Sequence, residues 1–474
     1  MPEQCSAAGM LKSICPFTDE TVAVWRGHSR EEILRTADAS ERAFQSWRIT
    51  SMEHRAVLLE RLAVLLEADR GRLAALMASE MGKPLSQGAS EVDKCALVCR
   101  YYAGHAQDFL QDITVPSEAA SCRIRHEPVG VIYAVMPWNF PLWQVFRFAA
   151  PTVAAGNGIL LKHSPNVTGC ALEIAALFRE AGFPEGLPGV LLVPAEDAGP
   201  VSSMLIHGPV VKAVSLTGSV AAGRAVARES GDALKKCVLE LGGSDPAIIL
   251  DDADLELAAR LSVYSRLINA GQNCIASKRF IVMEPVYDRF LELMEAEMRK
   301  AVMGDPMDPA TTLGPMARPD LRDALHALVT SSLEAGARRI LGGETPGMPG
   351  TFYPATILDR VTPDMPVAEE ETFGPVAAVL RARDERDAVR LAGSTRYGLG
   401  ASVFTSDLAR GEAIARELRA GACFVNTFVR SDPRFPFGGT GISGYGRELS
   451  VQGILEFVNT KVIWVENPRP TTGG

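Results

Sequence analysis

The chain has 474 residues, more than one ordinary hydrophobic core holds, so we expect two or more domains. Its 47% hydrophobic and 22% charged residues are typical of a soluble globular protein, and no apolar run reaches the roughly 20 residues of a membrane-spanning helix. The formal net charge of -9 argues against a protein that binds nucleic acid or a membrane surface. An anionic substrate would therefore need a local cluster of positive charge.

Nine cysteines are spread along the chain, from Cys5 to Cys423. The odd number and the length of the chain argue against a disulfide framework. Residues 1–16 lack the basic segment and apolar core of a secretory signal. We therefore expect a protein of the reduced cytoplasm.

The first third of the chain has the pattern of helices. Ser29 is a candidate N-cap for a helical segment that extends to Gly82, and residues 87–109 continue in the same style. Residues 122–127 alternate in polarity and end at Pro128, which favours an edge strand or a strand between subunits.

From Val129 onward, short apolar runs alternate with helical segments such as residues 170–181 and 221–228. This rhythm predicts a doubly wound parallel sheet. The predicted strands of this first unit are 129–135, 158–162, 189–193 and 212–217.

A second α/β unit follows, with early strands at 246–250 and 278–282 and later ones around Phe404 and at 422–426. Residues 468–474 are rich in Pro, Gly and Thr, a composition typical of a disordered tail.

Two residues stand out as candidates for covalent chemistry. Cys274, in Gly-Gln-Asn-Cys, could be a nucleophile, although a lone cysteine is more often a buried apolar side chain. Glu240 lies between two leucines, where burial would raise its pKa and make it a better base near neutral pH. A solvent-facing strand residue is an equally good interpretation of Glu240.

Three further features follow predicted strands, where α/β sheets bind their ligands. Asn139, in Pro-Trp-Asn-Phe-Pro, could donate to an oxyanion, or it could be a turn asparagine. Gly218, Ser219 and Gly223 open a helix whose N–H groups could bind a phosphate, but they do not form a G-x-G-x-x-G fingerprint. Lys162 could reach a ribose hydroxyl, or it could be a surface lysine.

Seven motifs occur in order along the chain: PWNFP, LLKHSPN, SLTGS, LELGG, GQNC, EETFGP and PFGG. In this the sequence resembles the aldehyde dehydrogenase superfamily, from about Ser13 to Val465. The resemblance implies that Cys274 is the catalytic nucleophile, Glu240 the general base and Asn139 the oxyanion donor.

The same resemblance implies a site for NAD or NADP, and it implies no metal. Lys162 and Ser164 would lie at the adenosine ribose and Gly218 and Ser219 near the pyrophosphate. Trp138 and Phe373 would lie beside the cofactor, and Glu371 would hold the nicotinamide ribose.

The implied reaction begins when the Cys274 thiolate attacks the aldehyde carbon. The Asn139 side chain and the Cys274 backbone N–H would stabilise the resulting oxyanion. After hydride loss to the coenzyme, Glu240 would activate the water that hydrolyses the thioester. Relatives that pass the acyl group to coenzyme A typically lack this glutamate, so hydrolysis is expected here.

Within the superfamily the sequence is most similar to bacterial succinate-semialdehyde dehydrogenases. Arg147 matches an arginine that binds the substrate's distal carboxylate, and Ser431 lies where that group has a serine in its substrate loop. A salt-bridged helix residue is the alternative for Arg147. The sequence has Ile268 where some of these enzymes have a second arginine, and Ala276 where some have a redox-switch cysteine.

Other small aldehydes stay open as substrates, namely glutarate semialdehyde or a biosynthetic aldehyde. Two other kinds of protein also stay open: a dehydrogenase that transfers the acyl group to coenzyme A, and a catalytically inactive relative. NAD-selective relatives often carry a glutamate three residues after the ribose lysine, where this chain has Pro165. We therefore expect both NAD and NADP to be used.

The family architecture implies two doubly wound domains and a small β extension. The cofactor domain would comprise residues 1–113 and 130–242, and the catalytic domain residues 243–450. The oligomerisation strands would comprise residues 114–129 and 451–468, with a strand near 123–127 paired to the C-terminal strand 461–465, followed by a flexible tail at 469–474. Unpaired strand edges on this extension favour a homodimer or homotetramer.

Overall fold

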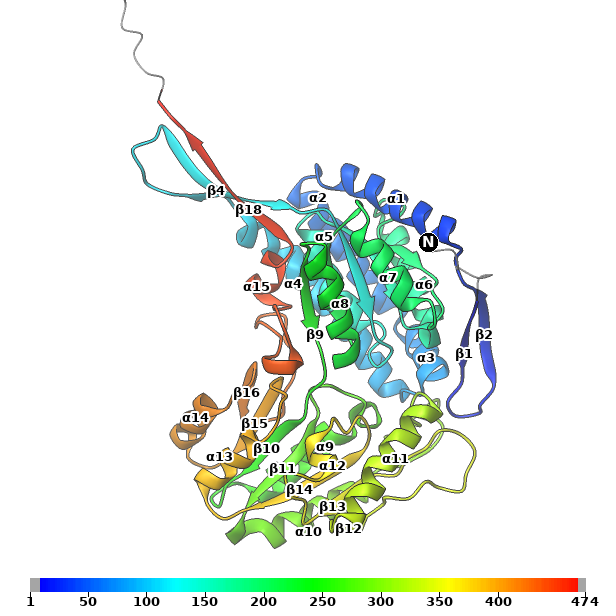
Figure 1. The fold of residues 1–474 in the computed structure, drawn as a ribbon, viewed down its shortest axis with the longest axis vertical. Coiled ribbons are helices and arrows are strands. Elements are labelled where there is room, and N and C mark those ends of the chain that lie inside the picture. The colour runs from blue at the N-terminus through cyan, green and yellow to red at the C-terminus, as the bar shows by residue number, and fades with distance from the viewer. Residues whose placement is uncertain (1–8, 468–474) are drawn as a thin grey trace, which may run out of the picture.

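The computed structural model describes residues 9–467 and shows two sheets, each flanked by helices, and a protruding β arm (Figure 1). The expected α/β class with two doubly wound units is therefore confirmed. The tail predicted at 468–474 lies outside the described residues. No helix in residues 9–467 is long and apolar enough to cross a membrane.

The first sheet has six strands in the order β17-β9-β8-β5-β6-β7, all parallel except β17. The chain runs outward from β5 to β7 and then returns to β8 on the other side of β5. This reversal creates a topological switch point between β5 and β8, where open α/β sheets bind ligands. The strands are β5 (Val131–Met136), β6 (Gly158–His163), β7 (Gly189–Leu191), β8 (Val211–Thr217), β9 (Lys236–Glu240) and β17 (Gly444–Tyr445).

The helical N-terminal segment packs around this sheet as three helices where the sequence pattern indicated one. Ser29 caps α1 in a capping box with Glu32, as expected, but Ser51 caps a new helix and Gly82 ends the third with a φ of 77°. The helices of this unit are α1 (Arg30–Trp47), α2 (Met52–Ala68), α3 (Arg70–Met81), α4 (Leu85–Leu110), α5 (Trp143–Ala154), α6 (Thr168–Ala181), α7 (Ala198–His207) and α8 (Val220–Asp232).

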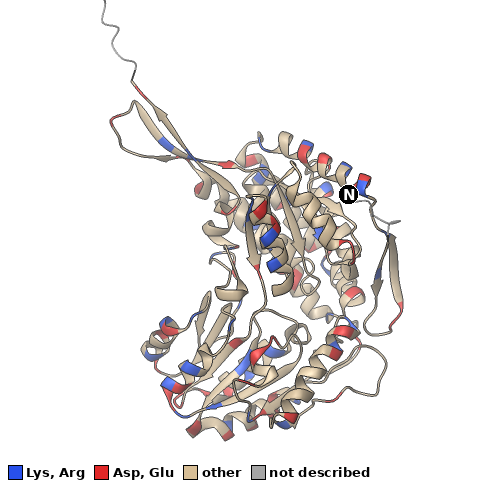
Figure 2. Cartoon of the chain, in the orientation of Figure 1, with Lys and Arg blue, Asp and Glu red and all other residues tan. Residues whose placement is uncertain are grey.

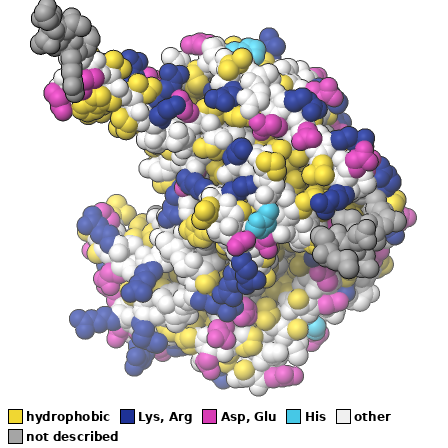
Figure 3. All heavy atoms as spheres, turned by 45° about the horizontal axis from the view of Figure 1, so that its top comes forward, with side chains coloured by type: hydrophobic (Ala, Val, Ile, Leu, Met, Phe, Trp, Pro, Cys, Tyr) yellow, Lys and Arg dark blue, Asp and Glu magenta, His cyan; other side chains and the backbone are white. Residues whose placement is uncertain are grey.

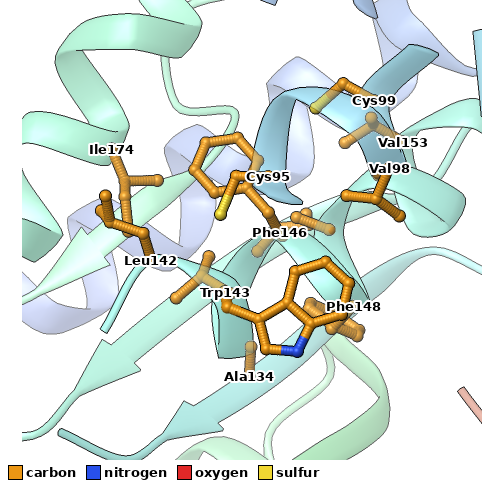
Figure 4. Close-up of a cluster of buried hydrophobic side chains, with 14 of the residues drawn as sticks. Cys95, Val98, Cys99, Ala134, Leu142, Trp143, Phe146, Phe148, Val153 and Ile174 are labelled. Atoms are coloured by element: carbon orange, nitrogen blue, oxygen red, sulfur yellow. The ribbon is translucent and has the colours of Figure 1, made fainter. Parts of the chain in front are cut away.

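A large apolar cluster joins α4 to α5. Cys95, Val98 and Cys99 on α4 face Trp143 and Phe146 on α5 across fully or almost fully buried contacts (Figure 4). Burial of such side chains stabilises by about 1.5–3 kcal/mol each. Residues next to these anchors, Lys94 among them, therefore have well-defined positions.

The second sheet has seven strands in the order β12-β13-β14-β11-β10-β15-β16, with only β12 antiparallel. Its strands are β10 (Asp245–Ile249), β11 (Ser277–Met283), β12 (Arg338–Leu341), β13 (Thr356–Asp359), β14 (Val376–Ala382), β15 (Gly400–Phe404) and β16 (Ala422–Val425). Its helices are α9 (Leu255–Leu267), α10 (Tyr287–Met298), α11 (Pro319–Glu334), α12 (Pro366–Glu369), α13 (Glu385–Gly393) and α14 (Leu408–Glu417).

The arm is a three-stranded antiparallel sheet of β3 (Ile113–Thr114), β4 (Ser121–Pro128) and β18 (Val458–Val465), preceded by α15 (Ser450–Leu455). Arg125 pairs with Lys461, and the ladder runs through to Ser121 and Val465, so the expected pairing of these segments is confirmed. The arm stands away from both sheets in Figure 1. The sequence pattern did not indicate the N-terminal hairpin of β1 (Met10–Ile14) and β2 (Thr21–Arg26).

Candidate active site

Opposite ends of the two sheets supply the candidate residues. In the first sheet they follow the strands: Glu240 ends β9, Gly218 follows β8, Asn139 follows β5, and Lys162 lies at the end of β6. In the second sheet they precede the strands, because Cys274 comes shortly before β11 and Glu371 shortly before β14. The site is therefore assembled where the carboxyl edge of one sheet meets the amino edge of the other.

The loop that carries Cys274 has an unusual backbone. Asn269 and Ala270 adopt left-handed conformations with φ of 56° and 52°, and Gly271 follows with φ of 72°. A Cβ on Gly271 would lie 2.3 Å from the carbonyl group of Gly374, so only glycine allows the two motif loops to touch here. GQNC and EETFGP are thus packed backbone against backbone.

Buried cations hold these loops by their carbonyl groups. The Lys278 ammonium donates to the carbonyls of Asn273 (3.0 Å) and Cys274 (2.6 Å), and Arg266 donates to that of Gly271. Loop carbonyls in the interior need such partners because no helix or strand satisfies them. Sequence analysis missed the role of Lys278, because a lysine at the start of a strand gave no signal.

Cys274 lies in a cavity of about 690 Å³. Burial raises the pKa of its thiol to about 12, and the positive charges of Arg147 and Lys278 oppose that shift. The same cavity is lined by apolar and polar side chains, including Phe140, Trp143, Phe437, Asn273, Lys94 and Ser431.

The Asn139 loop is bound to the Cys274 loop. The Asn139 side-chain amide donates to the carbonyl of Gln272 (3.2 Å), and the Asn139 carbonyl accepts from Asn269 Nδ2 (2.7 Å) and Lys83 Nζ (2.9 Å). Lys83 is also in a buried ion pair with Glu91, whose second oxygen accepts the N–H groups that begin α5. An amide nitrogen has two hydrogens, so one remains available beside the cysteine loop.

Glu240 is 2% exposed, and neither of its carboxylate oxygens has a hydrogen-bond partner within residues 9–467. Burial raises its pKa well above the usual value, the nearby Glu448 carboxylate raises it further, and Arg147 lowers it. A Cβ on Gly438 would lie 2.7 Å from Oε1, so a glycine at this position leaves the carboxylate room. An unpaired buried carboxyl of this kind is suited to take up a proton.

Arg147 lines the Cys274 cavity, but its guanidinium is already engaged. It forms a buried ion pair with Glu448, donates to the Thr217 hydroxyl (3.1 Å) and stacks 4.5 Å from the Phe437 ring centre. The salt bridge weighed from the sequence is therefore present, and a contact of Arg147 with the substrate stays a prediction. Sequence analysis did not single out Glu448.

Ser431 also lines the cavity, and its hydroxyl accepts a hydrogen bond of 2.6 Å from Lys94 Nζ. Lys94 was not a candidate, because from the sequence it is one polar residue on a long helix. Ile268 faces the cavity, whereas Arg266 is fully buried and binds the carbonyls of Gly271 and Ser277. No arginine thus stands at the position where some similar enzymes have a second one.

The residues expected at a nicotinamide cofactor lie along the first sheet's carboxyl edge and the facing loop. Ser219 caps α8, whose first-turn N–H groups form a ready site for a phosphate. Gly218 N–H donates to the Glu240 carbonyl (3.0 Å), which fixes the turn after β8.

Lys162 is 6% exposed, and burial lowers its pKa to about 8. Within residues 9–467 its ammonium has one hydrogen bond, to the His163 carbonyl (3.4 Å). No carboxylate of residues 9–467 lies within 4.0 Å of it, which leaves its charge available to a ligand. Ser164 Oγ donates to the Asn166 side chain (2.7 Å). His163 bridges the Pro141 carbonyl and the Ser164 N–H, and burial lowers its pKa to about 4, so it is a neutral structural residue.

Trp138 and Phe373 meet edge to face, 5.7 Å between ring centres, and so bring the first and second sheets' loops together. The Glu371 carboxylate accepts the Gly243 N–H (3.0 Å) and lies 3.6 Å from Lys278 Nζ. A helix N-terminus, a buried lysine with no carboxylate partner among residues 9–467 and a carboxylate thus follow or face the first sheet's carboxyl edge, and groups of these kinds suit the phosphates and riboses of a dinucleotide. The residues fit NAD(P).

Comparisons with known proteins show the family to which the chain belongs. Residues 4–463 match the model of the aldehyde dehydrogenase family. The succinate semialdehyde dehydrogenase Sad of Escherichia coli, whose name gives NAD(P)+ as coenzyme, is 45% identical over 452 residues, covering 95% of this chain and 97% of that protein.

Solved structures share the whole fold. The crystal structure of succinic semialdehyde dehydrogenase from Streptococcus pyogenes with NADP+ has a TM-score of 0.93 and 36% identity, covering 96% of this chain and 100% of that one. Apo betaine aldehyde dehydrogenase from Staphylococcus aureus has a TM-score of 0.92 and 30% identity, covering 98% of this chain and 93% of that one. Enzymes named for different aldehydes thus share the fold. The fold therefore does not determine the substrate, and the residues that line the cavity must do so. The chain belongs to the aldehyde dehydrogenase family of oxidoreductases.

Proposed function

We propose that this enzyme oxidises succinate semialdehyde to succinate, with NAD or NADP as coenzyme. The observation that carries the proposal is the charge of the Cys274 cavity in a chain of net charge -9. Five of the side chains that line the cavity are cationic, and two are carboxylates. Both carboxylates are paired, Glu297 with Lys300 and Glu91 with Lys83. The cations are Lys94, Arg147, Arg260, Lys300 and Arg430.

This local positive charge is what an anionic aldehyde requires. Figure 2 shows the chain's charged residues scattered over both units, in both signs. The names of the similar bacterial enzymes support the choice of succinate semialdehyde. A cavity of about 690 Å³ also admits a longer dicarboxylic semialdehyde such as glutarate semialdehyde.

The proposed chemistry uses three residues. The Cys274 sulfur bonds to the aldehyde carbon, and the free N–H of the Asn139 amide donates to the oxygen that becomes negative. NAD(P)+, when bound, supplies the hydride acceptor. Once the hydride has left, the acyl group is a thioester on Cys274, and Glu240 takes a proton from the water that hydrolyses it.

The coenzyme is held by Trp138, Lys162, Ser164, Gly218, Ser219, Glu371 and Phe373 in this proposal. Pro165, three residues after Lys162, places no carboxylate beside the ribose. Both NAD and NADP are therefore accepted, and the NADP+ complex of the similar streptococcal enzyme supports NADP. The cytoplasmic location expected from the cysteines stays a prediction.

Kinetics with a series of aldehydes test the substrate. The kcat/KM for succinate semialdehyde should exceed that for butanal, its uncharged analogue, by at least about 100-fold, because unpaired cavity charge favours the carboxylate. Malonate and glutarate semialdehydes measure the length preference, and each is run with NAD and with NADP. Equal kcat/KM for succinate semialdehyde and butanal would rule the proposal out.

Removal of the base should separate the two chemical stages. With Glu240→Gln we expect a burst of about one NAD(P)H per active site, followed by turnover slowed about 100-fold or more. Cys274→Ala should give neither burst nor turnover. Glu412→Gln, an exposed change of the same kind on α14, is the control. Wild-type turnover by Glu240→Gln would refute the assignment of the base.

The buried acids also set the pH dependence. Burial raises the pKa values of Cys274 and Glu240, so the deprotonated, active form of both groups becomes more populated as the pH rises. We expect kcat/KM for butanal to increase at least about tenfold from about pH 6 to about pH 9. Butanal is used because it has no carboxylate, so the ionisation of groups that bind a carboxylate does not affect its pH profile. A flat profile is the contrary result.

Assembly should depend on the arm. We propose that β18 associates with a second copy, giving a homodimer or homotetramer, because it is an edge strand with Val462 64%, Trp464 47% and Val465 46% exposed. Figure 3 shows hydrophobic side chains gathered on this protruding arm.

Sedimentation velocity tests the assembly. Val462→Glu with Trp464→Glu should yield a monomer, because charges would be buried at the interface. Asn459→Ser, on the opposite face of the same strand, should leave the oligomer intact. An oligomer that survives the double change would place the contact elsewhere.

A further inference from the structure

Lys94 lies inside the Cys274 cavity with an uncommitted charge. Its Nζ is 2.6 Å from Ser431 Oγ and 4.2 Å from the Trp143 ring centre. Among residues 9–467, no carboxylate lies within 4.0 Å of it. The nearest acidic groups are already paired: Glu91 with Lys83, and Asp432 with Arg434.

Such an ammonium is costly to bury without a counterion. Burial and, to a smaller extent, the positive charge of Arg147 lower the pKa of Lys94 to about 8. A bound carboxylate would reverse both effects. The environment of Lys94 therefore favours an anionic ligand.

The other cations of the cavity are less suited to this task. Arg147 is in its buried ion pair with Glu448, and Lys300 is paired with Glu297. Arg260 and Arg430 are exposed at the rim, where water weakens their attraction. Ile268, in the same cavity, is apolar.

We propose that Lys94 and Ser431 together bind the distal carboxylate of the aldehyde, which makes Lys94 a specificity-determining residue. The inference rests on the proposed function. The Ser431 oxygen accepts from Lys94, so its own O–H is free to donate to one carboxylate oxygen, and the ammonium has two further N–H groups for the carboxylate. In this proposal Arg147 does not contact the carboxylate, and its positive charge acts on Cys274 and Glu240.

The pair is held in place before substrate binds. Lys94 precedes Cys95, which is buried against α5 (Figure 4). The Lys94 ammonium lies 4.2 Å from the centre of the Trp143 ring on that helix. Ser431 lies on the loop after β16 and is 8% exposed. A site formed by a rigid helix and a packed loop loses little entropy on binding.

The test compares the ratio of kcat/KM for succinate semialdehyde to that for butanal. Lys94→Met should lower this ratio about 10- to 100-fold, mainly through KM for succinate semialdehyde, because one charge-assisted contact is removed. Lys94→Arg should restore most of the ratio. Arg100→Met, which removes a cation from the outer face of the same helix, is the matched control and should leave the ratio unchanged.

Arg147→Met distinguishes the two cavity cations. It leaves Glu448 unpaired beside Glu240, so it should lower kcat for both aldehydes and change the ratio much less than Lys94→Met does. If Lys94→Met does not fold, Ser431→Ala carries the test, and it should lower the ratio several-fold.

The outcomes separate the two proposals. A wild-type enzyme without preference for succinate semialdehyde over butanal refutes the proposed function. A wild-type preference that survives both Lys94→Met and Ser431→Ala, or that is lost in Arg147→Met instead, overturns the role of Lys94 alone.

Discussion

The active site depends on buried cations that satisfy backbone carbonyls. The catalytic segments are irregular loops in the interior, and irregular backbone leaves carbonyl groups that neither helix nor sheet can pair. Lys83, Arg266 and Lys278 bind those of the Asn139 and Cys274 loops. Each cation is fully or almost fully buried, so removing one would leave several polar groups unsatisfied at once. The loops therefore behave as one rigid body formed by both sheets.

The same burial governs the reactive groups. It raises the pKa of Cys274 and of Glu240 and so favours the neutral form of both side chains. The Arg147–Glu448 pair acts on Glu240 in opposite directions, because Glu448 raises the pKa of Glu240 and Arg147 lowers it. Electrostatic interactions are strong between buried groups, so small changes in nearby charge alter the ionisation of these side chains.

The proposed chemistry and the proposed recognition use different parts of the chain. The groups proposed to act on the aldehyde carbon lie where the two sheets meet, whereas Lys94 and Ser431, proposed to bind its carboxylate, belong to α4 and the loop after β16. Substitutions on α4 or in the loop after β16 can therefore change the substrate preference without altering the residues that act on the aldehyde carbon. This agrees with the shared fold of enzymes named for succinic semialdehyde and betaine aldehyde.

The sequence by itself determined the fold class, eight of the thirteen strands of the two sheets, the pairing of the arm strands and the family. It did not indicate β9, β12, β13, β14 or β17. The features that it did determine depend on residues that are close together in the chain, so they can be recognised from the sequence. They include strand periodicity, capping residues such as Ser29 and the seven ordered motifs. The tertiary structure alone decided which charges meet. Arg147, predicted to bind a substrate, lines the cavity and also pairs with Glu448, some 300 residues away in the chain. Lys94 donates to Ser431, which lies 337 residues further along the chain. No pattern along the chain encodes such contacts, because they arise only when the helices and loops of different units pack together.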